Sequence, residues 1–157
     1  MKIADAVKLA EKSGEVKALE KQGYFLNSAM AFLEAIDRDV VVWNLTYYEP
    51  NSNQIVQFAV DDDSVLLKDK GAPMRPSIQK LEMSMVKTSV EKMLAKAEKE
   101  YNKFKQPMGQ IILTLQKEKD SPSWRFNFIT KTLYLITVAI DAKTGKIISS
   151  QMSSMVK

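Results

Sequence analysis

The spacing of apolar residues predicts two short helices at the start of the chain. Between Ile3 and Ser13 the apolar side chains fall on one helical stripe, at Ile3, Ala6, Val7 and Ala10. Gly14 is a suitable stop for this helix. Residues 15–22 then predict a second short helix that ends at Gly23.

From Ala29 onwards an alternating pattern, typical of strands, replaces the helical spacing. We predict four strands in this half, over residues 29–36, 40–48, 55–60 and 65–68. The second is the clearest, because β-branched and aromatic residues fill it and Glu49-Pro50-Asn51-Ser52-Asn53 ends it. The acidic sequence Asp61-Asp62-Asp63-Ser64 predicts the turn between the third and fourth strands.

Residues 70–76 contain a glycine and two prolines and predict a linker between a first domain, 1–72, and a second, 73–157. Ser77 is a candidate N-cap for a long helix that continues to Pro107. Its apolar stripe comprises Ile78, Leu81, Met85, Val90, Met93, Ala97, Tyr101 and Phe104. Such a helix would span roughly 40 Å. Four more strands are predicted over 111–116, 124–129, 133–140 and 146–149.

The two halves of the chain can be aligned on each other. Trp43-Asn44-Leu45-Thr46-Tyr47 matches Trp124-Arg125-Phe126-Asn127-Phe128, and each stretch is followed by an alternating strand that ends in Asp61 or Asp141. A chance match is the alternative, since strands draw on few residue types. We expect an α+β fold of two tandem repeats, each a helix plus a four-stranded antiparallel meander. We expect the repeats to pack together through the long second helix.

The sequence Ile140-Asp141-Ala142-Lys143-Thr144-Gly145-Lys146-Ile147, after a tryptophan strand and an alternating strand, resembles the end of a PepSY domain. In this turn Asp141 and Thr144 can bond backbone groups, and Gly145 can supply a positive φ. The resemblance covers residues 77–150. The first half is a degenerate copy, without a glycine in its turn and with its helix broken at Gly14.

The resemblance to the PepSY family implies a non-enzymatic α+β module that binds and restrains a protease or another protein. Such modules occur in protease propeptides and in exported or membrane-associated proteins. No catalytic residues come with the family, so none is assigned here.

Composition excludes several chemistries. The 157 residues include no histidine and no cysteine. Disulfides, thiolate nucleophiles, Cys/His zinc sites and histidine-based acid–base catalysis are therefore impossible. We predict no catalytic, metal-ligating or cofactor-binding residue.

Other apparent motifs have simpler explanations. Asp61-Asp62-Asp63 lacks the glycine and distant glutamate of a calcium loop, so we interpret it as a solvated turn. We attribute the three Ser-x-x-Lys matches, Ser77/Lys80, Ser89/Lys92 and Ser154/Lys157, to coincidence. The sequon Asn44-Leu45-Thr46 falls inside a predicted strand, and we assign Met85 and Met93 to core packing.

Charge differs along the chain. Residues 29–76 carry a net charge of −4, whereas residues 77–157 carry +7. The two repeats could attract each other, which we favour, or the basic half could receive an acidic protein, anionic lipid or nucleic acid. Nucleic acid is not expected, because Trp124, Phe126 and Phe128 are assigned to the core. A membrane surface is kept as an alternative binding partner.

The sequence therefore predicts a protein-binding module that restrains a protease or a membrane-associated partner, using a sheet edge, a hairpin tip or the groove between repeats. The alternative is a carrier of a small molecule or lipid, in an apolar pocket lined by Trp43, Tyr47, Phe58 and Trp124. A hydrolase that uses carboxylates alone is a third hypothesis. The compartment is extracytoplasmic if an export signal has been removed, and cytoplasmic if Met1 is the native start.

Overall fold

The computed structural model describes residues 1–34, 39–73 and 78–156, and its fold is α+β. The first half contains α1 (Ile3–Lys12), α2 (Gly14–Lys21), β1 (Phe25–Glu34), β2 (Trp43–Glu49), β3 (Gln54–Val60) and β4 (Val65–Gly71). The second contains the 3-10 turn η1 (Met83–Met85), α3 (Val90–Asn102), β5 (Met108–Glu118), β6 (Ser121–Thr130), β7 (Tyr134–Asp141) and β8 (Ile147–Ser154). Within the described ranges, no helix has the length and apolar character needed to cross a membrane.

All eight strands form one antiparallel sheet in the order β4-β3-β2-β1-β5-β6-β7-β8. Within each half, consecutive strands pair with each other. The halves meet in the middle of the sheet, where β1 pairs with β5 from Ser28–Gln116 to Glu34–Gln110. The expectation that the halves join through a long helix is therefore wrong, because a strand ladder joins them.

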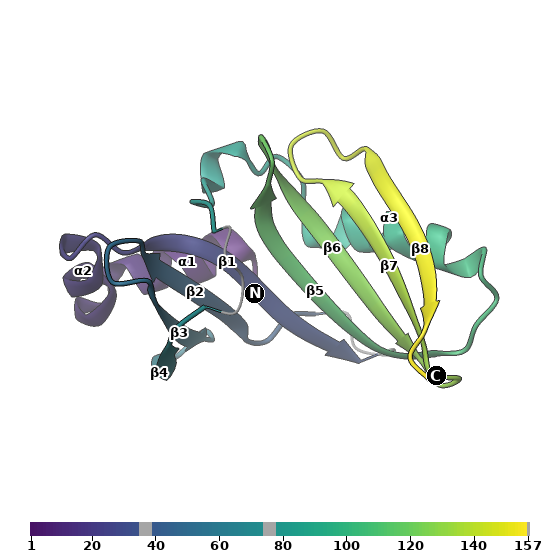
Figure 1. Cartoon of the computed structure of the whole chain (residues 1–157), viewed down its shortest axis with the longest axis horizontal. Coiled ribbons are helices and arrows are strands. Elements are labelled where there is room, and N and C mark those ends of the chain that lie inside the picture. The colour runs from purple at the N-terminus through teal and green to yellow at the C-terminus, as the bar shows by residue number, and fades with distance from the viewer. Residues whose placement is uncertain (35–38, 74–77, 157) are drawn as a thin grey trace.

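One face of this sheet is covered and the other is open (Figure 1). Helix α1 contacts β2 and β3, and α3 contacts β6 and β7, on the same side of the sheet. Strand side chains alternate between the two faces, so every second residue points into the core. The largest fully buried side chains are Trp43, Trp124, Tyr47, Phe58, Phe126 and Phe128.

The two tryptophans meet at the centre of the core. Trp43 lies opposite Val60 in the β2–β3 ladder, and Trp124 lies opposite Ile140 in the β6–β7 ladder. Their ring centroids are 6.4 Å apart and both side chains are fully buried. Both indoles also find hydrogen-bond acceptors, as buried indoles usually do.

Each indole is bonded to the residues just before a helix. The Trp43 Nε1 donates to the Met1 carbonyl at 3.0 Å, before α1. The Trp124 Nε1 donates to the Thr88 hydroxyl at 2.9 Å, before α3. The tryptophan pair therefore ties the residues before both helices to the core.

The predicted long helix is wrong. Helix α3 begins at Val90, and the Ser89 hydroxyl caps it by accepting the Lys92 N–H at 3.3 Å. The preceding backbone bonds to other elements, because the Leu81 N–H donates to Leu26 and the Lys87 N–H to Ala142. These bonds compete with helix formation. Ser77, the predicted cap, lies outside the described residues.

The remaining elements form as predicted, with shifted ends. Ser13 ends α1 and also caps α2, its hydroxyl accepting the Val16 N–H at 3.2 Å, so Gly14 opens a helix instead of closing one. Strand β1 begins at Phe25, four residues early, and its predicted end at Ile36 lies outside the described residues. Strand β4 continues to Gly71, into the predicted linker. Residues 74–76 of that linker also lie outside the described residues.

The turn chemistry predicted at Asp141 is present, and the turn at Asp61 has equivalent bonds. The Asp141 Oδ1 accepts the N–H groups of Lys143 and Thr144 at 2.8 and 3.0 Å, and Gly145 has a φ of +79°. The Asp61 Oδ1 likewise accepts the N–H groups two and three residues later, at 2.9 and 2.8 Å. Burial raises the pKa of Asp141, but the hydrogen bonds outweigh it and hold that pKa below its ordinary value.

Replacing Asp141 by Ala should lower the melting temperature at neutral pH by roughly 3 °C, because the turn loses its acceptor. Since the folded-state pKa is lowered, the stabilisation is present above the ordinary pKa of 3.8 and is lost as the pH falls through the lowered value. Thermal melts at neutral and acidic pH measure this. Asp62→Ala, in the other turn, is the control, and a pH-independent difference between wild type and Asp141→Ala would contradict the prediction.

Replacing Trp43 and Trp124 by Phe, singly and together, should reveal a coupling energy of about 0.5–1.5 kcal/mol, because the rings are in contact. Urea unfolding of the four proteins of this double-mutant cycle provides the values. Trp43→Phe combined with Tyr101→Phe is the matched control. The ring of Tyr101 packs against Phe128, whereas the ring of Trp43 packs against Trp124, so these two substitutions should be additive. Additive effects of the two tryptophan substitutions would show that the indole contact contributes nothing.

Candidate functional site

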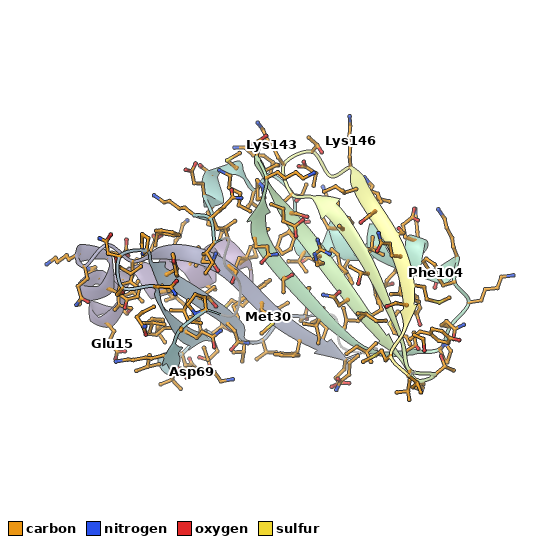
Figure 2. The ribbon with its side chains drawn as sticks, viewed as in Figure 1. Glu15, Met30, Asp69, Phe104, Lys143 and Lys146 are labelled. Carbon is orange, nitrogen blue, oxygen red and sulfur yellow. The ribbon has the colours of Figure 1, made fainter. Side chains whose placement is uncertain are left out.

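The open face of the sheet carries half-buried apolar and polar side chains. Met30 lies near the middle of this face (Figure 2). Phe32, further along β1, is 59% exposed. The polar positions fall on neighbouring strands of both halves and comprise Ser28, Thr46, Gln57, Thr114, Gln116, Arg125 and Asn127. A hydrogen-bonding surface therefore crosses the junction between β1 and β5.

A cleft of about 690 Å³, called here the open-face cleft, is hollowed into this surface. Strands β1, β2, β3, β5 and β6 supply its floor. Its described lining is Asn27, Ser28, Thr46, Ile55, Gln57, Pro73, Ile78, Gln79, Thr114, Gln116, Lys117, Glu118, Lys119, Arg125 and Asn127. Both halves of the chain contribute, so the cleft exists only when β1 and β5 are paired.

One wall includes Pro73, Ile78 and Gln79, three described residues that lie in the chain between β4 and η1. The Asn27 side-chain amide holds this wall by donating to the Gln79 carbonyl at 3.1 Å. Asn27 lies at a bulge in the β1–β2 ladder. A bulge leaves one residue outside the regular pairing and redirects its side chain. The irregularity in β1 thus contributes directly to the shape of the cleft.

Another wall is the β5–β6 hairpin, and it is cationic. Lys117, Lys119 and Arg125 line it, and Glu118 is the single carboxylate in the described lining. The Arg125 Nη2 lies 2.7 Å from the Glu118 Oε1, and the Gln116 amide donates to the same oxygen at 3.2 Å. These bonds hold the guanidinium over the cleft, while the two lysines leave an excess of positive charge beside it.

This arrangement can recognise a polar, negatively charged chain. Side-chain amides and hydroxyls on the floor can bond the backbone of a bound segment, and the cations can bond its carboxylates. Among the residues that the structure describes, no group of three His, Cys, Asp or Glu side chains is placed to hold a metal ion.

A smaller, mostly apolar cleft of about 350 Å³ lies on the helix side. The beginnings of α1 and α3 face it from the two halves. Its described lining is Met1, Lys2, Ile3, Ala4, Asp39, Val40, Met83, Val86, Thr88, Ser89, Val90 and Glu91. This helix-side cleft therefore adjoins Met1 and Thr88, the acceptors of the two indole hydrogen bonds.

The four aromatic residues predicted to line a carrier pocket line neither cleft. Trp43, Tyr47, Phe58 and Trp124 are at most 2% exposed and pack in the core. The rings of Tyr47 and Phe58 meet edge to face, 5.9 Å apart. Burial, followed by the charges of Glu11 and Glu20, raises the pKa of Tyr47 far above its usual value.

The other motifs have structural positions. Ser89 is the cap of α3, Met93 is buried in the core, and the sequon Asn44-Leu45-Thr46 lies within β2. Asp61, the first residue of the acidic run, closes the β3–β4 turn because its carboxylate accepts the backbone N–H groups of Asp63 and Ser64. Ser77 and Lys157, one member each of two Ser-x-x-Lys pairs, lie outside the described residues.

Sequence reasoning missed the open-face cleft. Its floor could have been found from the polar positions that alternate with core residues, such as Thr114 with Leu113 and Arg125 with Trp124. Its cationic wall could have been found from Lys117-Glu118-Lys119 at the end of a strand. The wall formed by the connecting segment had no such signal, because the apolar spacing from Ile78 to Met85 fits a helix.

Comparison with known proteins shows the fold. No known family model matches the chain, and no curated protein matches it. A solved structure from Clostridium difficile, described as "a putative lipoprotein", superposes with a TM-score of 0.65 at 12% identity, covering 98% of this chain and 93% of that one. The PepSY resemblance stays a prediction.

Proposed function

We propose that the chain is a non-enzymatic protein-binding module that holds an acidic segment of a partner protein in the open-face cleft. The observation that carries this proposal is the lining of the cleft. It joins a floor of amides and hydroxyls from both halves to a wall with three cations and one carboxylate. A protease or a membrane-associated protein is the partner class that we propose from the PepSY resemblance.

The uncovered sheet face supports binding of a large partner. Helices α1 and α3 lie on the other side of the sheet (Figure 1), so a partner could approach the floor directly. Protein interfaces combine an apolar part with a polar rim. Phe32 and Met30 would supply apolar contacts next to the polar cleft.

The tandem-repeat interpretation belongs to the same proposal. It is supported by the strand order, which places β1 and β5 at the centre with three strands on either side. It is also supported by the two tryptophans, each bonded to the start of a helix. The carboxylates of Asp61 and Asp141 each accept the backbone N–H groups of the residues two and three positions later. A duplicated unit would account for a cleft built from both halves.

We propose an extracytoplasmic location. It is supported by the fold shared with a protein described as a lipoprotein, and it agrees with the setting of PepSY modules.

Reversing the charge of the cationic wall tests the proposal. Lys117→Glu with Lys119→Glu should weaken partner binding about tenfold or more, because like charges would then face the acidic segment. The measurement is affinity capture from the source organism, followed by cross-linking and titration of each purified partner against wild type and variant.

Lys12→Glu with Lys17→Glu is the matched control, since it makes the same change in charge on α1 and α2. Circular dichroism should show both variants folded. Capture of no protein, or equal binding by wild type and the Lys117/Lys119 variant, would refute the proposal.

A small-ligand carrier is a second candidate, and the helix-side cleft favours it. Its volume of about 350 Å³ and mainly apolar lining are in the range of small-molecule sites. An apolar ligand bound there would touch Met1 and Thr88, and both are bonded to tryptophans in the core.

Binding in the helix-side cleft should therefore change tryptophan fluorescence. Addition of a fatty acid should shift the emission of wild type, and Val86→Phe should block the shift by filling the cleft without adding a tryptophan. Trp43→Phe and Trp124→Phe identify the responding indole. No change in fluorescence, together with native mass spectra of protein alone, would exclude a carrier of such ligands.

A further inference from the structure

The two edges of the sheet differ in a way that concerns assembly. Strand β4 forms one edge and β8 the other. An edge strand presents unpaired backbone N–H and C=O groups that another strand can bond. Soluble proteins block such pairing with charges, prolines or bulges on the edge.

Strand β4 carries these protections. Lys68, Asp69 and Lys70 lie within it, and a bulge divides its pairing with β3 between Gln57 and Phe58. Asp69 is visible at this edge in Figure 2. A second strand would meet a broken backbone register and three charged side chains.

Strand β8 lacks them. The ten residues 147–156 include no charged residue and no proline. The one bulge is at the start of the strand, and Ser149 to Ser154 pair with β7 in unbroken register. Strand β8 is the last strand in the sheet order, and Figure 1 shows it at the outer edge of the sheet, with the C-terminal part of α3 behind it.

Exposed apolar side chains accompany this open edge. Ile148 is 58% exposed, Met152 42% and Met155 53%. Leu133, whose carbonyl accepts the Met155 N–H at 2.9 Å, is 52% exposed. A strand added to β8 would cover part of this apolar surface as well as satisfy backbone groups.

We propose that β8 pairs with β8 of a second copy of this chain, so that two sheets become continuous. Antiparallel pairing about a two-fold axis makes a strand complementary to itself, because each copy donates the bonds that the other accepts. It also places Lys146 of the two copies at opposite ends of the ladder, roughly 30 Å apart.

The charges that face this edge set the salt dependence. Lys143 and Lys146 lie at the β7–β8 hairpin (Figure 2), and the Glu100 carboxylate of α3 accepts the Ser150 hydroxyl at 3.2 Å. The second half as a whole is positive, with +7 over residues 77–157. Repulsion between two such halves is screened by salt, so dimerisation should strengthen as the salt concentration rises.

The test is the oligomeric state of the chain, measured by sedimentation and by light scattering over a wide concentration range. Wild type should form dimers, and Gln151→Lys should weaken the dimer about tenfold or more, because it places like charges near the two-fold axis. Leu66→Lys adds the same charge to β4, the protected edge of the sheet, and should leave the dimer intact. Hydrogen exchange should show β8 amides protected in proportion to dimer content.

A monomer at every concentration and salt would overturn the proposal, including one that instead binds an extended peptide at β8. A dimer weakened equally by Leu66→Lys and Gln151→Lys, or one without protection of β8, would also overturn it. Thermal melts establish that both variants are folded. The proposal does not depend on the open-face cleft, so Lys117→Glu with Lys119→Glu should keep the dimer, and at low salt should dimerise at least as tightly as wild type because it lowers the positive charge of the second half.

Discussion

The pairing of β1 with β5 is the interaction on which the rest of the structure depends. Each four-stranded meander is small, and a core of that size is marginal on its own. The β1–β5 ladder converts two small sheets into one, and it brings Trp43 and Trp124 into contact beneath the junction. Because the indoles also bond the residues before α1 and α3, the same junction positions the helices. The open-face cleft spans this junction, so fold and candidate site have a common origin.

Local patterns predicted most of this architecture. The alternation of large apolar residues identified the strands, and the pairing of Trp43 with Val60 and of Trp124 with Ile140 agrees with the alignment made from sequence. Turn chemistry at Asp141 and Gly145 was equally legible. These features depend on residues close in the sequence. The joining of β1 to β5 could not be predicted in the same way, since it depends on contacts some eighty residues apart, such as Ala31 with Leu113.

The prediction of a long helix was wrong for a related reason. Helical spacing continues back from Ser89 through Met85 to Leu81, but backbone bonds to Leu26 and Ala142 hold this segment in another conformation. Leu81 is still buried, so its apolar character was interpreted correctly and its geometry was not. The extended path of the segment is also what brings Ile78 and Gln79 to the open face. A continuous helix from Ser77 would have left the cleft without one of its walls.

The protected β4 edge has a consequence for the size of any assembly. A protein whose two edge strands can both pair with another copy can add copies without limit, which leads to fibres. Here the bulge and the charges of Lys68, Asp69 and Lys70 terminate the sheet on one side. Growth by strand pairing would accordingly stop after a single addition, leaving a closed particle with both outer rims blocked. Neutralising those three side chains would remove the charged part of this barrier and leave the bulge alone to prevent open-ended polymerisation.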